Sequence, residues 1–138
     1  MISRKNALPV LVSALIAASG SAAASQWSVI SVDGTPAMGT PVIVFAESAI
    51  SGDTGCNRFN ATGTFEAADG TLVVSSPVAT TRMACPGETL TAQDDKIIAM
   101  FEGSIFVAFD VFSDLLTLTS SDITLVLARQ AEADTTAE

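Results

Sequence analysis

The chain has 138 residues, with six Lys and Arg against fifteen Asp and Glu, and a formal net charge of −9 at pH 7. This acidity argues against nucleic acids and anionic lipid surfaces as partners, because both are polyanions. The sequence contains no His and no Tyr, which excludes Ser-His and Cys-His nucleophile pairs and the usual His-based zinc sites. We therefore expect a protein that is not an enzyme and that has no metal and no cofactor.

Residues 1–24 have the pattern of a secretory signal peptide. Arg4 and Lys5 give a positive start, residues 7–18 are apolar, and the small residues up to Ala24 fit a cleavage site. The apolar run is shorter than the roughly 20 residues that a bilayer span needs, and no cysteine stands near the cleavage site to accept a lipid. We expect a periplasmic or secreted protein with a mature charge of −11, since the signal carries two of the basic residues and no acids. An uncleaved anchor is the alternative.

Short strand-like runs follow, separated by turn residues. Residues 27–32 alternate, so that Trp27 and Val29 share one face and Val32 lies on the other. Asp69-Gly70 is a hairpin signal, and residues 55–60, rich in Gly and Asn, indicate a shaped turn. Further strands are expected at residues 41–46, 49–52, 62–66, 71–74, 78–83, 105–109, 115–119 and 123–128.

The period of the apolar residues changes over residues 88–102. Leu90, Ile97 and Phe101 fall near one helical face, and Gly103 follows as a stop signal. The fold class is therefore mainly β (α+β): a partly open antiparallel β-barrel of about eight short strands, with one amphipathic helix packed on a face or an end of the sheet. Residues 25–129 form this single domain, and residues 130–138 are expected to be a disordered acidic tail.

Cys56 and Cys85 are the two cysteines of the chain. In an exported protein they are best explained by one structural disulfide. It closes a loop of about 30 residues, for which chain entropy predicts roughly 3.6 kcal/mol of stabilisation. Two thiolates without His leave a metal site half filled, and the absence of Cys-x-x-Cys spacing argues against a redox-active pair.

The segments around the cysteines carry the most specific pattern. It consists of Trp27 in the first strand, Gly55-Cys56-Asn57-Arg58-Phe59, Thr81-Arg82-Met83-Ala84-Cys85, and a final Leu116-Thr117-Leu118 run. Over residues 26–129 this pattern resembles the META domain, or HslJ-like, family. The family's helix usually carries a Glu where Asp94 stands, and many relatives have a lipid-anchor cysteine that this chain lacks.

The resemblance implies a partly open antiparallel barrel with a packed helix, a location in the bacterial envelope, and links to heat-shock or drug tolerance. Some relatives look similar in fold to secretin pilot proteins, which bind lipid tails or a partner's C-terminal segment. Our leading hypothesis is an exported, non-enzymatic, monomeric, stress-related binding module whose partner is an envelope protein or a small apolar ligand. The alternative is a carrier or pilot-like protein that binds a lipid tail or an apolar peptide in a partly open barrel.

Two interpretations are possible for each group of motif side chains. Asn57 with its neighbours either forms a polar recognition loop or caps the turn, and we favour capping. Arg58 and Arg82 either bind an anionic ligand or pair with nearby acids, and we favour pairing with Asp53, Glu66 or Asp94. The Phe and Met side chains either fill the core or line an apolar cavity, and we favour the core.

Overall fold

A computed structural model of the chain describes residues 24–75 and 77–130. The expected signal peptide therefore lies outside the described residues apart from Ala24, which opens the first strand. The expected tail lies outside them apart from Gln130. The backbone N–H of Gln130 donates to the carbonyl of Gln26 at 3.0 Å, so the hydrogen-bonded chain runs one residue beyond the expected domain end.

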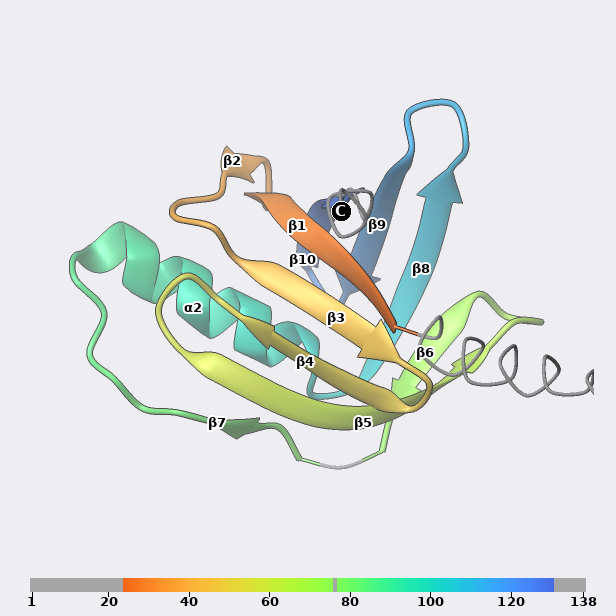
Figure 1. Ribbon diagram of the computed structural model, residues 1–138, viewed down its shortest axis with the longest axis horizontal. Coiled ribbons are helices and arrows are strands. Elements are labelled where there is room, and N and C mark those ends of the chain that lie inside the picture. The colour runs from red at the N-terminus through yellow and green to blue at the C-terminus, as the bar shows by residue number, and fades with distance from the viewer. Residues whose placement is uncertain (1–23, 76, 131–138) are drawn as a thin grey trace, which may run out of the picture.

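Ten strands and one helix make up this described part of the chain (Figure 1). In order they are β1 (Ala24–Val32), β2 (Thr35–Pro36), β3 (Val42–Ala46), β4 (Ala49–Asp53), β5 (Arg58–Glu66), β6 (Thr71–Val74), β7 (Ala79–Thr80), α2 (Glu88–Met100), β8 (Ser104–Asp110), β9 (Leu115–Ser120) and β10 (Ile123–Arg129).

Eight of the strands close into an antiparallel barrel. Their order around the ring is β1-β3-β4-β5-β6-β8-β9-β10, and β10 pairs back onto β1. The two-residue strands β2 and β7 add to β1 and β5. The expected mainly β barrel with one packed helix is confirmed, and its ring of strand pairs is closed where we expected it to be partly open. Closure removes the exposed strand edges that template aggregation.

A β-bulge in β1 decides which of its side chains face the core. The register between β1 and β10 shifts between Val29 and Ser31. As a result Trp27, Val29 and Val32 are all buried, while Ile30 is exposed. The expectation that Val32 lies opposite Trp27 was wrong, because the extra residue of a bulge resets the alternation along the strand.

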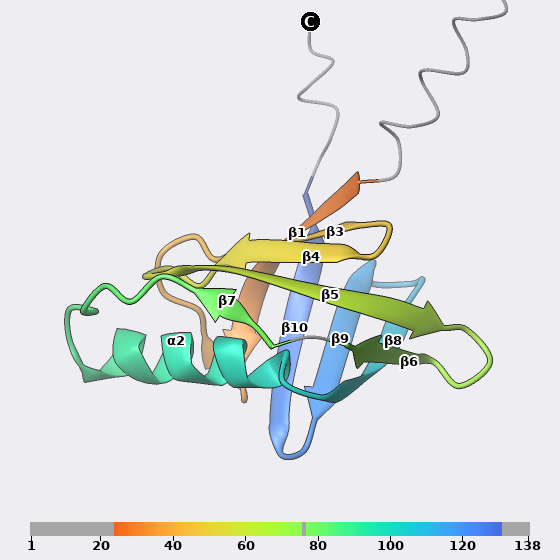
Figure 2. The ribbon, with the colours of Figure 1, turned by 90° about the horizontal axis from the view of Figure 1, so that it is seen from below.

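The helix α2 lies across one end of the barrel (Figure 2). Ile97 and Met100 are fully buried there, and the ring of Phe101, just after the helix, stacks on the ring of Phe59 with centroids 5.1 Å apart. On its outer side Lys96 reaches Asp33, in the turn after β1, at 2.8 Å. The prediction of an amphipathic helix that covers an end of the sheet is confirmed.

Apolar side chains fill the interior between α2 and the strands. The fully buried ones come from six of the elements and the residue after α2: Ile43, Phe59, Ile97, Met100, Phe101, Ile105, Leu118, Leu125 and Leu127. The expectation that the Phe and Met side chains are core residues therefore holds for Phe59, Phe101 and Met100, and fails for Met83, which is 62% exposed. It was wrong for Phe65, Phe106 and Phe109, which are 53%, 65% and 41% exposed, because these positions lie at a barrel end or on the outer face.

Two strand boundaries near the motif differ from expectation. β5 begins at Arg58 rather than at residue 62, and the extended run expected at residues 78–83 contains only the two residues of β7. Beyond β7 the segment of residues 81–86 passes in front of the start of α2 and is not part of a strand. One backbone bond, from the Thr81 N–H to the Arg58 carbonyl at 3.0 Å, continues the pairing with β5, and side chains hold the rest of the segment.

Candidate functional site

The two cysteines join the turn after β4 to the segment that leads into α2. Their Sγ atoms are 2.03 Å apart and their Cα atoms 5.7 Å apart, which is the geometry of a disulfide bond. Both residues are half-buried. The bond holds residues 81–86 against the turn at residues 54–57, so the two halves of the motif form one cluster.

Thr54 organises this turn, although no sequence signal singled it out. Its hydroxyl accepts hydrogen bonds from the backbone N–H groups of Cys56 at 3.1 Å and Asn57 at 2.9 Å. The turn passes through Gly55 at φ +100°, and a Cβ there would lie 2.9 Å from Nε2 of Gln93 on α2. Glycine is therefore required both by the backbone conformation and by the close approach of the helix.

Asn57 is the centre of the cluster and is 4% exposed. Its Oδ1 accepts from the Thr81 hydroxyl at 2.8 Å and from the Met83 N–H at 2.7 Å. Its Nδ2 donates to the Met83 carbonyl at 3.2 Å and to both carboxylate oxygens of Asp94 at 3.3 Å. Our expectation that Asn57 caps its own turn was wrong, because Thr54 does so and leaves the amide free to bridge three segments.

Asp94 enters the cluster from α2 and is 9% exposed. Its Oδ1 also accepts from the Thr54 hydroxyl at 2.5 Å. No Lys or Arg of the described residues forms an ion pair with it. The carboxylate is therefore held by neutral donors, and its burial fixes the middle of α2 over the turn. Asp94, which stands where the family's helix usually carries a Glu, thus helps to pack α2 against the barrel.

A groove of about 540 Å³ runs over this cluster, between residues 80–85 and α2. Asp94, Asp95 and Glu102 line it from the helix side, and Arg82 and Met83 from the other. The Cys56 and Cys85 sulfurs and an Asp94 oxygen lie within 4.8 Å of one another. A disulfide offers no thiolate for a metal, so this trio is not a metal centre while the bond is intact.

Arg58 and Arg82 do not pair with acids as we expected. The ion pairs among residues 24–75 and 77–130 are those of Lys96 with Asp33 and of Arg129 with Asp114. The nearby carboxylates have other partners: Asp53 accepts from the backbone N–H of Gly55 at 2.7 Å, and Asp94 accepts from the motif. Both arginines are exposed, and Arg82 lines the groove.

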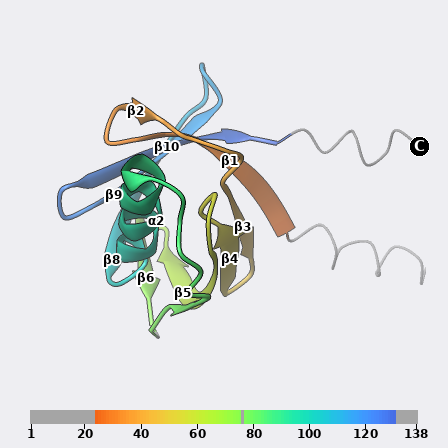
Figure 3. The same ribbon diagram turned by 90° about the vertical axis from the view of Figure 1, so that its left-hand side faces the viewer.

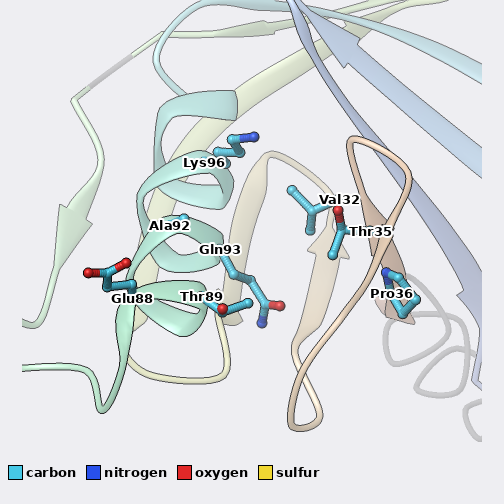
Figure 4. Close-up of a pocket in the computed structure, with 8 residues that line it drawn as sticks. All are labelled: Val32, Thr35, Pro36, Glu88, Thr89, Ala92, Gln93 and Lys96. Carbon is cyan, nitrogen blue, oxygen red and sulfur yellow. The ribbon is translucent and has the colours of Figure 1, made fainter.

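A second hollow of about 320 Å³ lies between α2 and the β1–β2 turn (Figure 4). The Gln93 side chain extends from α2 with its amide end below Val32 and Thr35 in this view. The amide oxygen accepts from the Met38 N–H at 2.8 Å, and the amide nitrogen donates to the Met38 carbonyl at 3.0 Å. At the edge of the hollow, the hydrogen bond from Lys96 and the N–H of Thr124 hold the pKa of Asp33 below its ordinary value of 3.8. These contacts anchor α2 to the barrel.

The chain matches the META domain family over residues 21–132, which is more than half of its length. It belongs to the META domain family. None of the curated proteins matches this chain. The META-domain motif thus builds a clamp, formed by Thr54, Asn57, Asp94 and the disulfide, that fastens α2 and residues 81–86 to the barrel.

The clamp offers little to a substrate. The hydroxyl of Thr54 and the carboxylate of Asp94 are paired as a nucleophile and a base would be, but Thr54 is fully buried and its oxygen already accepts two backbone N–H groups. Phe59 is in the core, and Gly55 is enclosed by Gln93.

Within the described ranges, no helix has the length and apolarity of a membrane crossing.

Proposed function

We propose that this META-domain protein is an exported, monomeric, non-enzymatic binding module of the cell envelope, with the stress-related role that the family resemblance implies. The disulfide geometry supports an oxidising compartment. The clamp supports a non-enzymatic role, because its polar atoms bond one another and its hydroxyl is inaccessible. We therefore expect the function on another part of the surface, outside the clamp.

The observation that carries the proposal is an excess of exposed apolar side chains. Four of the large apolar residues that the described chain exposes lie at the ends of β5 and β8 and in the turn after β8: Phe65, Phe109, Val111 and Phe112. Single exposed apolar residues are normal, but groups of them on a small domain mark interaction sites. A binding surface for an apolar partner follows from this group.

The second candidate is a carrier of a lipid tail or an apolar peptide, and the same side chains favour it. Carriage inside the barrel requires a void that the ligand fills. The interior is occupied by Ile43, Phe59, Leu118 and their neighbours, all essentially inaccessible. An apolar ligand is therefore expected on the outer surface or at a barrel end rather than in the interior.

Protein purified from its own envelope tests the proposal. Intact-mass analysis is expected to give a chain that begins at Ser25 and is two mass units lighter than its reduced form. Native mass spectrometry, or mild crosslinking before purification, is expected to retain a specific partner or adduct. An unprocessed chain in the cytosol, or a protein that stays alone in both experiments, would contradict the proposal.

A further inference from the structure

The two ends of the barrel differ in what covers them. α2 covers the end at which β1, β4 and β9 finish and β5, β8 and β10 begin. The other end is formed by the starts of β1, β4, β6 and β9 and the finishes of β3, β5, β8 and β10. In Figure 3 the start of β1 and the finish of β10 lie on the side away from α2. No element of the described chain lies across this second end, which we call the uncovered mouth.

Inward-facing Phe side chains surround the uncovered mouth. Phe65 pairs with Leu72, and Phe109 pairs with Leu116. Both partners are buried, and directly paired residues point to the same side of a sheet, so Phe65 and Phe109 face the barrel axis. They are nevertheless 53% and 41% exposed, and Phe112 in the adjoining turn is 96% exposed. The mouth is thus an apolar surface that no helix or strand of the described residues covers.

The mouth already holds one cation on its aromatic rings. The guanidinium carbon of Arg129 lies 4.6 Å from the centre of the Trp27 ring and 5.6 Å from that of Phe109. The two rings meet edge to face at 6.1 Å. Such stacking is favourable because the ring faces are electronegative. The site therefore has the chemistry to accept a cationic group together with an apolar one.

Acidic residues stand in the turns around this mouth. Glu47 follows β3, Glu66 ends β5, and Asp110 and Asp114 flank Phe112. Asp114 has the ion pair with Arg129, at 3.7 Å. The other basic residues of the described chain, Arg58, Arg82 and Lys96, belong to the end that α2 covers. An apolar centre with an acidic rim is complementary to an apolar segment with basic flanks.

We propose that the uncovered mouth binds a peptide segment of another exported protein in which an apolar anchor is flanked by Lys or Arg. This inference rests on the proposed function as a binding module and names its partner class. An anionic membrane would be repelled by the acidic rim. The chain's own residues 131–138 contain three acids and no base, so their charge is not complementary either.

Trp27 reports on occupancy of the mouth, because it is the single tryptophan of the chain and lies beneath Arg129. The mature, oxidised protein is titrated with a synthetic peptide of Lys, Leu and Phe, which has no tryptophan of its own. The control peptide has Glu in place of every Lys. We expect a saturable change in Trp27 emission with the basic peptide alone, and weaker binding at high salt. Equal responses to both peptides would overturn the inference.

Matched variants locate the site. Phe112→Ser and Phe65→Ser are expected to weaken peptide binding by about fivefold or more each, as loss of an anchor does. Phe106→Ser removes an exposed ring from the outer face of β8 and is expected to leave binding unchanged. Phe112 lies in an exposed turn, so its replacement keeps the fold, which urea unfolding verifies. Equal effects of Phe106→Ser and Phe112→Ser would contradict a site at the mouth.

Two further experiments separate peptide binding at the mouth from binding to a lipid surface and from binding elsewhere on the protein. Vesicles of phosphatidylcholine, with and without phosphatidylglycerol, replace the peptide, and binding to vesicles but not to the basic peptide would overturn the inference in favour of a lipid surface. Phe112→Ser protein is also purified from the envelope beside the wild type. An adduct retained equally by both would refute the mouth while the binding module stands, whereas no adduct on the wild type would refute the proposed function itself.

Discussion

Replacement of Asn57 by Ala is expected to be among the most destabilising substitutions in this chain. The amide bridges the turn after β4, residues 81–83 and α2. Its removal breaks hydrogen bonds with the Thr81 hydroxyl, with the N–H and carbonyl of Met83, and with the Asp94 carboxylate. Asp94 is then left nearly buried with the Thr54 hydroxyl as its remaining bond.

The magnitude follows from the kinds of bond that are lost. Three bonds between neutral groups contribute about 1 kcal/mol each, and the bond to the carboxylate about 1.5 kcal/mol. The free energy of unfolding should therefore fall by about 4.5 kcal/mol in Asn57→Ala. Domains of this size are stable by about 5–15 kcal/mol, so the variant is expected to be folded but marginal.

Urea unfolding followed by the emission of Trp27 measures the loss. With a slope of about 1–2 kcal/mol/M, the midpoint should fall by about 2–4.5 M. Asn60→Ala is the matched control, since Asn60 is exposed in β5, three residues after Asn57, and surface substitutions change stability by about 0.5 kcal/mol or less. A loss below about 1 kcal/mol in Asn57→Ala, or one equal to that of the control, would refute the clamp.

Three other outcomes follow from the same structure. Reduction of the disulfide should lower the free energy of unfolding by about 3.6 kcal/mol, and an unchanged urea midpoint in reductant would contradict this. Gly55→Ala should lower the free energy of unfolding by more than about 2 kcal/mol, because the new Cβ meets Gln93. Gly34→Ala is the control: Gly34 has φ +83° and open space around it, so the loss should be backbone strain of about 1 kcal/mol. Equal losses in the two variants would be evidence against the close approach of Gln93. The pKa of Asp33 is lowered in the folded state, so its contribution to the free energy of unfolding is present above about pH 4 and is lost as the pH falls through the lowered pKa. In urea unfolding, Asp33→Asn should therefore lose less stability than the wild type between about pH 5 and pH 2. Parallel stability curves for the two proteins would contradict this.

Local patterns in the sequence were sufficient for most of the fold. Alternation and turn residues located the strands from Val42 onward, and the change of period located α2. The bulge in β1 could not be predicted, because it depends on the register with β10, nearly a hundred residues away. Closure of the barrel depends on the same long-range pairing.

The sequence predicted several of the residues that form the candidate site, but not what each of them does there. The presence of two cysteines in a chain expected to be exported pointed to the bond between Cys56 and Cys85, and the motif resemblance pointed to Asn57. Thr54 and Gln93 were missed, because a lone Thr or Gln has no signal until the helix and the turn are brought together. Phe65 and Phe109 resemble core residues in sequence, since only the position of a strand's end tells whether an inward-facing side chain is covered.

Amide hydrogen exchange, with and without the basic peptide, tests most directly whether the clamp has a structural role and the uncovered mouth is the binding surface. The account predicts slower exchange on binding in residues 45–49, 64–70 and 107–114, with little change in residues 54–57 and 79–95. Protection confined to residues 79–95, along the groove beside α2, would contradict it.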